Sequence, residues 1–78
     1  MLQVSRRLKQ NTMKNSIKLE RAIKNITQAE LADLAKVSRQ NIHAVETGKY
    51  VPSTVLALKI ARIFGKSVED IFKLEETD

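Results

Sequence analysis

Apolar residues recur at helical intervals after residue 15, and they predict a first helix that runs to about Lys24. Asn15 or Ser16 can cap this helix, because a short polar side chain accepts a hydrogen bond from the first turn. Arg21 lies beside the apolar positions. These positions, which are expected to form one buried stripe, are Leu19, Ala22, Ile23 and Ile26.

A second helix is predicted from Gln28 to about Lys36. Thr27 and Glu30 have the T-x-x-E spacing of a capping box, in which each side chain accepts a hydrogen bond from the backbone N–H of the other residue. Its small residues permit close contact with a neighbouring helix. The residues expected to be buried are Ala29, Leu31, Ala32 and Ala35.

A third helix is predicted over residues 39–46, with Ser38 as its cap. Ile42 and Val45 face inward at helical spacing, and the rest of the helix is mostly polar. Residues 47–49 stop it, because Gly48 suits a left-handed backbone. The residues expected to face away from the core are Arg39, Gln40, Asn41, His43 and Ala44.

Two further helices follow Pro52 and Ser53. Residues 54–64 are apolar on most sides, so this segment is expected to form the buried centre, with Phe64 in the core and little besides Lys59 and Arg62 left for solvent. Gly65 ends it. Ser67 and Asp70 offer a second capping box for a last helix. The core-facing residues of that helix are expected to be Val68, Ile71 and Phe72.

Composition narrows the fold class to all-α. The chain has 78 residues, which allows one domain, and it has three aromatic residues and two glycines, so architectures rich in strands and tight turns are poorly supported. We expect a domain over residues 13–75 and an acidic tail over 76–78. Residues 1–12 are interpreted as a flexible basic arm; they either continue the first helix, form a basic extension, or lie upstream of the native start.

Charge is distributed unevenly along the chain. Residues 13–66 hold ten basic and four acidic side chains, whereas residues 67–78 hold one basic and five acidic ones. A basic body suits a polyanionic partner, because cations near phosphates release condensed counterions. A basic body alone also fits proteins that bind nothing acidic. The chain has no cysteine, signal peptide pattern or membrane-spanning apolar run, so the cytoplasm is the expected compartment and no membrane contact is expected.

The second and third predicted helices have the dimensions of a helix-turn-helix. The N-terminus of the second can offer backbone donors and Gln28 to a phosphate, while the third presents Ser38, Arg39 and Gln40 to base edges. Arginine matches guanine O6 and N7 with two hydrogen bonds, and glutamine matches adenine N6 and N7. Alternatively, both are ordinary solvated surface residues.

The segment TQAELADLAKVSRQNIHAVETGKYVPS resembles the helix-turn-helix of the Cro/repressor (XRE) family, whose pattern is TQ-x-x-LA, VS, I, E-x-G and P. The resemblance extends from Met13 to about Glu75, and it is nearest to compact single-domain members. It implies a five-helix, lambda-repressor-like DNA-binding domain in which the third helix reads sequence.

The resemblance also implies a division of DNA contacts. Bases would face Ser38, Arg39, Gln40 and Ala44. The phosphate backbone would meet Thr27, Gln28, Asn41, Thr47, Lys49 and Tyr50. His43, the only histidine, lies on the exposed side of the third helix, where it can touch a base or a phosphate. Tyr50 either hydrogen-bonds a phosphate or packs over the loop.

Two positions bear on how the third helix is held. Arg21 and Glu46 match family positions that often pair across the first and third helices; alternatively they are unconnected surface charges. The turn position usually held by glycine is Lys36, and Ala35 stands where leucine is frequent. A lysine there either adopts a positive φ, at a cost of about 1 kcal/mol, or the turn takes another shape.

Taken together, the sequence predicts a DNA-binding transcriptional regulator, with repression as the expected action. We expect a homodimer on a pseudo-palindromic operator, formed through the C-terminal helix, where Ile71, Phe72 and Leu74 supply more apolar surface than a small core needs. The alternative is an adaptor or antitoxin-like component that holds a protein partner. The chain lacks a catalytic triad, a metal cluster and a phosphate loop, so we expect no enzymatic activity, cofactor or small-molecule ligand.

Overall fold

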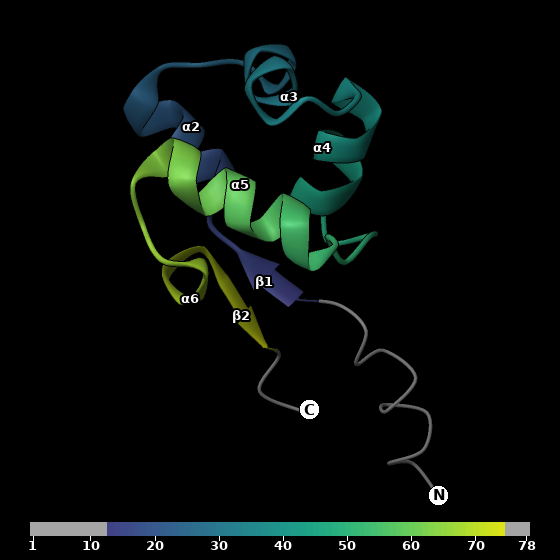
Figure 1. Ribbon diagram of the computed structural model, residues 1–78, viewed down its shortest axis with the longest axis vertical. Helices are drawn as coiled ribbons and strands as arrows, with labels where there is room; N and C mark the ends of the chain where they lie inside the picture. Colours follow the sequence, from purple (N-terminus) through teal and green to yellow (C-terminus); the bar gives the residue numbers. More distant parts are fainter. Residues whose placement is uncertain (1–12, 75–78) are drawn as a thin grey trace, which may run out of the picture.

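The computed structural model describes residues 13–74, which form five helices and a two-stranded sheet (Figure 1). The order is β1 (Met13–Asn15), α2 (Ile17–Lys24), α3 (Gln28–Ala35), α4 (Arg39–Glu46), α5 (Thr54–Phe64), α6 (Val68–Ile71) and β2 (Phe72–Leu74). The all-α prediction is confirmed apart from the small sheet. The expected arm over residues 1–12 and acidic tail over 76–78 lie outside the described residues.

Four helices begin at side-chain caps, and the sequence indicates the caps of three of them, α3, α4 and α6. Thr27 and Glu30 form the capping box of α3, and Ser67 and Asp70 form that of α6. Ser38 and Ser53 each accept a hydrogen bond from the third residue of their helix. At the start of α2 the Ser16 side chain makes no such bond, and the Oδ1 atom of Asn15 instead accepts from the N–H of Ile17.

The core lies between α2, α3, α4 and α5, and α6 and β2 close it from below in the view of Figure 1. Aliphatic residues dominate it, as the composition predicts. Its buried members are Ile17, Leu31, Ala32, Ala35, Ile42, Val45, Leu56, Ile60, Ala61, Ile71 and Phe72. Phe64 packs against this cluster while only partly buried.

The stripe predicted for the first helix is wrong for Leu19, Ala22 and Ile23, which are exposed, whereas Ile26 is partly buried against the core. Leu19 and Ile23 are 59% and 67% exposed, whereas Ile17 and the carboxylate of Glu20 are buried. Glu20 is tolerated inside because Lys66 Nζ donates to its Oε2 over 2.7 Å. The helix therefore turns a charged face inward and leaves two large aliphatic side chains in solvent.

Three other burial predictions also need correction. Ala29 is exposed, because the first turn of α3 borders an open cleft. On α5, Val55 and Leu58 are exposed, because the helix packs on the body with one side only. That helix buries Leu56, Ile60 and Ala61.

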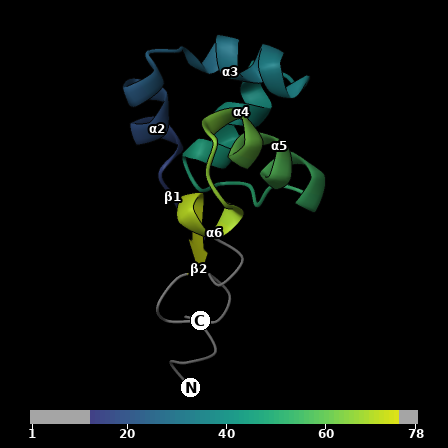
Figure 2. The ribbon, with the colours of Figure 1, turned by 60° about the vertical axis from the view of Figure 1, so that its left-hand side comes forward.

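The last helix is shorter than expected, because the chain leaves it after Ile71 to pair with β1. The two strands are antiparallel, with Met13 opposite Leu74 and Asn15 opposite Phe72. Ile71 and Phe72 are both buried in the domain's own core. The surplus of apolar surface predicted on this helix is therefore absent, and only Leu74 of the three residues remains exposed. Figure 2 shows the sheet on the side of the domain away from α3.

Candidate nucleic-acid interface

Helix α4 separates its apolar and polar residues sharply. Ile42 and Val45 are 0% and 1% exposed, so the helix is held firmly against the body. Arg39, Gln40 and His43 are exposed on the other side. Because Ser38 caps the helix through its Oγ atom, the first turn is well formed and its polar side chains stand at a defined edge of the molecule.

Helix α3 and the turn after it set the beginning of α4. Leu31, Ala32 and Ala35 are buried, and the two helices pack closely, as expected from small side chains. Lys36 ends α3 with a φ of 61°, in the left-handed region, and the N–H of Val37 donates to the carbonyl of Ala32. The turn thus keeps the shape that glycine would give it, at a backbone cost of about 1 kcal/mol.

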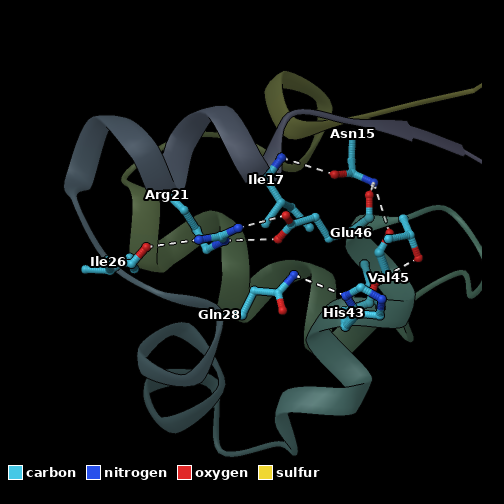
Figure 3. A network of polar contacts seen from close by, with 9 residues as sticks. Asn15, Ile17, Arg21, Ile26, Gln28, His43, Val45 and Glu46 are labelled. Carbon is cyan, nitrogen blue, oxygen red and sulfur yellow. Dashed lines mark hydrogen bonds and ion pairs between the residues drawn. The ribbon is translucent and has the colours of Figure 1, made fainter.

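The end of α4 is tied to the N-terminal part of the chain (Figure 3). Arg21 donates from Nε and Nη2 to the two carboxylate oxygens of Glu46, over 3.0 and 2.8 Å, and from Nη1 to the carbonyl of Ile26. Both side chains are largely buried, at 16% and 8% exposure. The predicted pair is therefore formed, and its hydrogen bond raises the pKa of Arg21 further above its ordinary value.

Sequence reasoning missed a second tie at the same end, made by Asn15. Its Nδ2 donates to the carbonyls of Val45 and Glu46 over 3.0 and 3.3 Å. The sequence suggested Asn15 only as a cap, because a three-residue strand has no detectable periodicity and the partners lie about thirty residues away. Figure 3 shows Asn15 and Arg21 approaching Glu46 from different sides.

Several predicted DNA-contacting residues come together around Arg39. This residue lines an open cleft of about 470 Å³ together with Arg21, Thr27 and Gln28. It also lines a neighbouring cleft of about 280 Å³ with Gln40 and His43. Between the two clefts, the Nε2 atom of Gln28 lies 3.4 Å from Nδ1 of His43 (Figure 3).

The other predicted contacts are less directly available. The hydroxyl of Thr47 donates to the carbonyl of His43 over 2.8 Å, so it must turn away before it can donate to a phosphate. Ala44 and Asn41 are half-buried. Lys49 and Tyr50 follow α4, and their backbone N–H groups donate to the carbonyl of Ala44. Tyr50 is half-exposed at this edge.

A charged and polar edge of this kind can bind a row of anionic groups through hydrogen bonds and opposite charge. Residues 13–74 contain no group of three His, Cys, Asp or Glu side chains placed to hold a metal ion. Each helix in this range also lacks the length and apolar character that a membrane crossing requires. Two short packed helices, with a polar first turn on the second, define a helix-turn-helix protein.

Comparison with known proteins shows which helix-turn-helix family this chain resembles. A helix-turn-helix family model matches residues 17–71. An uncharacterized HTH-type transcriptional regulator of Methanocaldococcus jannaschii is 53% identical over 66 residues, which are 85% of this chain and all of the relative. The uncharacterized HTH-type regulator YgzD of Bacillus subtilis is 47% identical over 82% of this chain and 97% of its own.

A solved structure agrees. The clp gene regulator ClgR of Corynebacterium glutamicum superposes with a TM-score of 0.66 at 31% identity, over 70% of this chain. The match spans 58% of the ClgR chain. The protein belongs to the XRE-type helix-turn-helix family of DNA-binding transcriptional regulators.

Proposed function

We propose that this regulator recognises a specific duplex sequence by placing the first turn of α4 in the major groove. The observation that carries the proposal is the pairing of a fully buried side, formed by Ile42 and Val45, with an exposed first turn that holds Arg39 and Gln40. A helix held in this way can present side chains at fixed positions to base edges.

Base contacts in this proposal come from Ser38, Arg39, Gln40, His43 and Ala44. Arg39 and Gln40 carry most of the discrimination, because each can form two hydrogen bonds to one base and so distinguish it by about 1 to 3 kcal/mol. His43 adds a contact one helical turn further along. Ala44 is half-buried and offers its methyl group, which suits a thymine methyl.

Phosphate contacts surround these residues. Thr27 and Gln28 stand at the N-terminus of α3, where backbone N–H groups and the helix dipole favour an anion. Asn41, Thr47, Lys49 and Tyr50 border the other side of α4 and complete the proposed backbone contacts. The open cleft beside Arg39 supports this arrangement, because it leaves room for a phosphate between the two helices.

The proposed complex is a cytoplasmic homodimer that represses transcription from a pseudo-palindromic operator with half-sites about 34 Å apart. Burial of Ile71 and Phe72 leaves α6 little apolar surface for dimerisation. We therefore place the dimer contact mainly on α5, where Val55 and Leu58 are 62% and 55% exposed. Leu74, which is exposed on β2, adds to this contact.

Light scattering tests the dimer. At micromolar concentration it should give a dimer for the wild type and a monomer for Leu58→Glu. A wild-type monomer would remove the dimer from the proposal.

Selection from random duplexes tests the reading role of α4. The recovered site should be titrated with wild type and Arg39→Ala at several salt concentrations. Arg39→Ala should lose about tenfold or more in affinity and should relax selectivity at one base pair. Lys49→Ala, the control, should weaken binding to all sequences alike. It should also reduce the slope of the logarithm of affinity against the logarithm of salt concentration by about one.

The same experiment can contradict the proposal. If no sequence is enriched, or if Arg39→Ala retains wild-type selectivity, α4 does not read bases. A protein-binding adaptor with this fold would then be the better interpretation.

A further inference from the structure

Asn15 makes contacts that no simple helix cap would make. Its Oδ1 atom accepts from the N–H of Ile17 at the start of α2, over 3.1 Å. At the same time its Nδ2 atom donates to the carbonyls of Val45 and Glu46 at the end of α4 (Figure 3). One half-buried amide thus joins the beginning of one helix to the end of another.

These carbonyls belong to the last turn of α4, where no following turn of helix supplies N–H partners. The carbonyl of Val45 also accepts from the N–H of Gly48 over 3.1 Å, whereas Asn15 is the donor to both carbonyls. A donor fixed in the body of the domain therefore determines where this end of the helix sits. Asn15 is itself fixed, because it stands opposite Phe72 in the sheet and because the N–H of Ser16 donates to the carbonyl of Ile71.

The position of the C-terminal end of α4 also determines where its first turn, with Arg39 and Gln40, is placed. Eight residues of α-helix span about 12 Å, so a tilt of about 10° moves one end by about 2 Å relative to the other. Hydrogen bonds to bases tolerate only a few tenths of an ångström. Ile42 holds the centre of α4 against the core, so such a tilt would pivot there and move the first turn by about 1 Å.

We propose that Asn15 is a positioning residue for DNA recognition, which sets the angle of α4 by anchoring its last carbonyls. Asn15 touches no base in this role; it acts through Arg39 and Gln40, and the inference rests on the proposed reading role of α4. The Arg21–Glu46 pair holds the side chain of the same terminal residue, so Asn15 supplies the complementary anchor for the backbone.

Asn15→Asp separates the two roles of this residue. An aspartate keeps the acceptor for Ile17 and still favours the N-terminus of α2, but it has no donor for the carbonyls of α4 and repels them. We expect Asn15→Asp to bind the selected site about tenfold more weakly than wild type, the scale of one lost hydrogen bond. Binding to random duplex should change by less than about twofold, because phosphate contacts tolerate a tilt better than base contacts.

Two controls distinguish positioning from general stability. Ile60→Val thins the same core from α5, outside the hydrogen bonds of Asn15, and it should leave the ratio of specific to random binding unchanged. In an Arg39→Ala background, Asn15→Asp should have little further effect on the selected site. Equal losses on both duplexes, or full additivity with Arg39→Ala, would overturn the proposal.

A measurement without DNA keeps the test independent of the proposed function. Residual dipolar couplings of backbone amides give the direction of α4 relative to α5. Asn15→Asp should rotate α4 by about 10° or more, the scale at which base contacts fail, and Asn15→Ala should do the same if the aspartate variant folds poorly. An unchanged direction would refute the role of Asn15. Failure of wild type to select any site would instead refute the proposed reading of DNA.

Discussion

Helices α2 and α4 both have eight residues, but they differ in the kind of side chain that they bury in the core. Helix α4 buries its aliphatic residues, Ile42 and Val45, and exposes its polar ones. Helix α2 buries Ile17 and Glu20, and it leaves Leu19 and Ile23 in solvent.

The difference comes from charge partners that are distant in the sequence. Lys66 lies 46 residues from Glu20, and Glu46 lies 25 residues from Arg21. The hydrogen bond and the charge of Glu20 raise the pKa of Lys66, which therefore stays protonated alongside the buried carboxylate. A helix can thus bury a charged side when the rest of the fold supplies the opposite charges.

The largest loss of stability should follow from a substitution on the aliphatic side of α4. Ile42→Ala removes a fully buried side chain and should lower the free energy of unfolding by about 4 kcal/mol, because a cavity remains in a small core. A domain of this size has about 5 kcal/mol in total. Urea denaturation followed by circular dichroism measures the change. A loss below about 1 kcal/mol would mean that α4 is not held by packing.

Substitution on the charged side of α2 should lower the free energy of unfolding nearly as much. Arg21→Met leaves Glu46 buried without its partner and should cost about 3 kcal/mol at neutral pH. The double variant Arg21→Met/Glu46→Met should recover most of this loss, because two apolar residues need no partner. If the double variant is no more stable than the single one, then packing by the arginine stem, rather than charge pairing, orients α2.

A smaller effect is expected where α3 leads into α4. Lys36→Gly removes a left-handed lysine and should raise the free energy of unfolding by up to about 1 kcal/mol. Asn25, which ends α2 with a φ of 60°, gives a matched control. Asn25→Gly should gain less, because asparagine adopts this conformation more easily than lysine. Thermal unfolding of the two variants side by side makes the comparison, and a loss of stability in Lys36→Gly would contradict it.

The smallest effect should come from the exposed aliphatic residues of α2. Leu19→Ser/Ile23→Ser should change the free energy of unfolding by less than about 0.5 kcal/mol per site, because neither side chain is in the core. Leu31→Ser, a fully buried leucine on α3, is the contrasting control and should be strongly destabilising. A large cost for the α2 pair would restore the apolar stripe that the sequence suggested.

The two helices also show what sequence alone could predict. Local signals located α3 and α4 closely, because caps such as Thr27 with Glu30, and Ser38, act within one turn. The family resemblance indicated the Arg21–Glu46 pair. The same local reasoning failed for α2, because the spacing of residues cannot reveal that Lys66, 46 residues away, pairs with Glu20 in the folded protein.

The remaining misses have the same origin. Strand β2 follows α6 only because β1 lies alongside it, and three residues leave no periodic signal. Asn15 was considered for one of its hydrogen bonds and not for the two that reach α4. Contacts across the fold, rather than local propensity, decide these cases.

The small sheet has a consequence for how this domain can be combined with other sequences. Pairing of Met13 with Leu74 sets the first and last described residues next to each other, on the side away from α3 (Figures 1 and 2). Close ends of this kind favour circular permutation and insertion into a host protein. A designer can therefore splice the domain into a loop of another protein through these two neighbouring points, with α3 and the first turn of α4 facing outward.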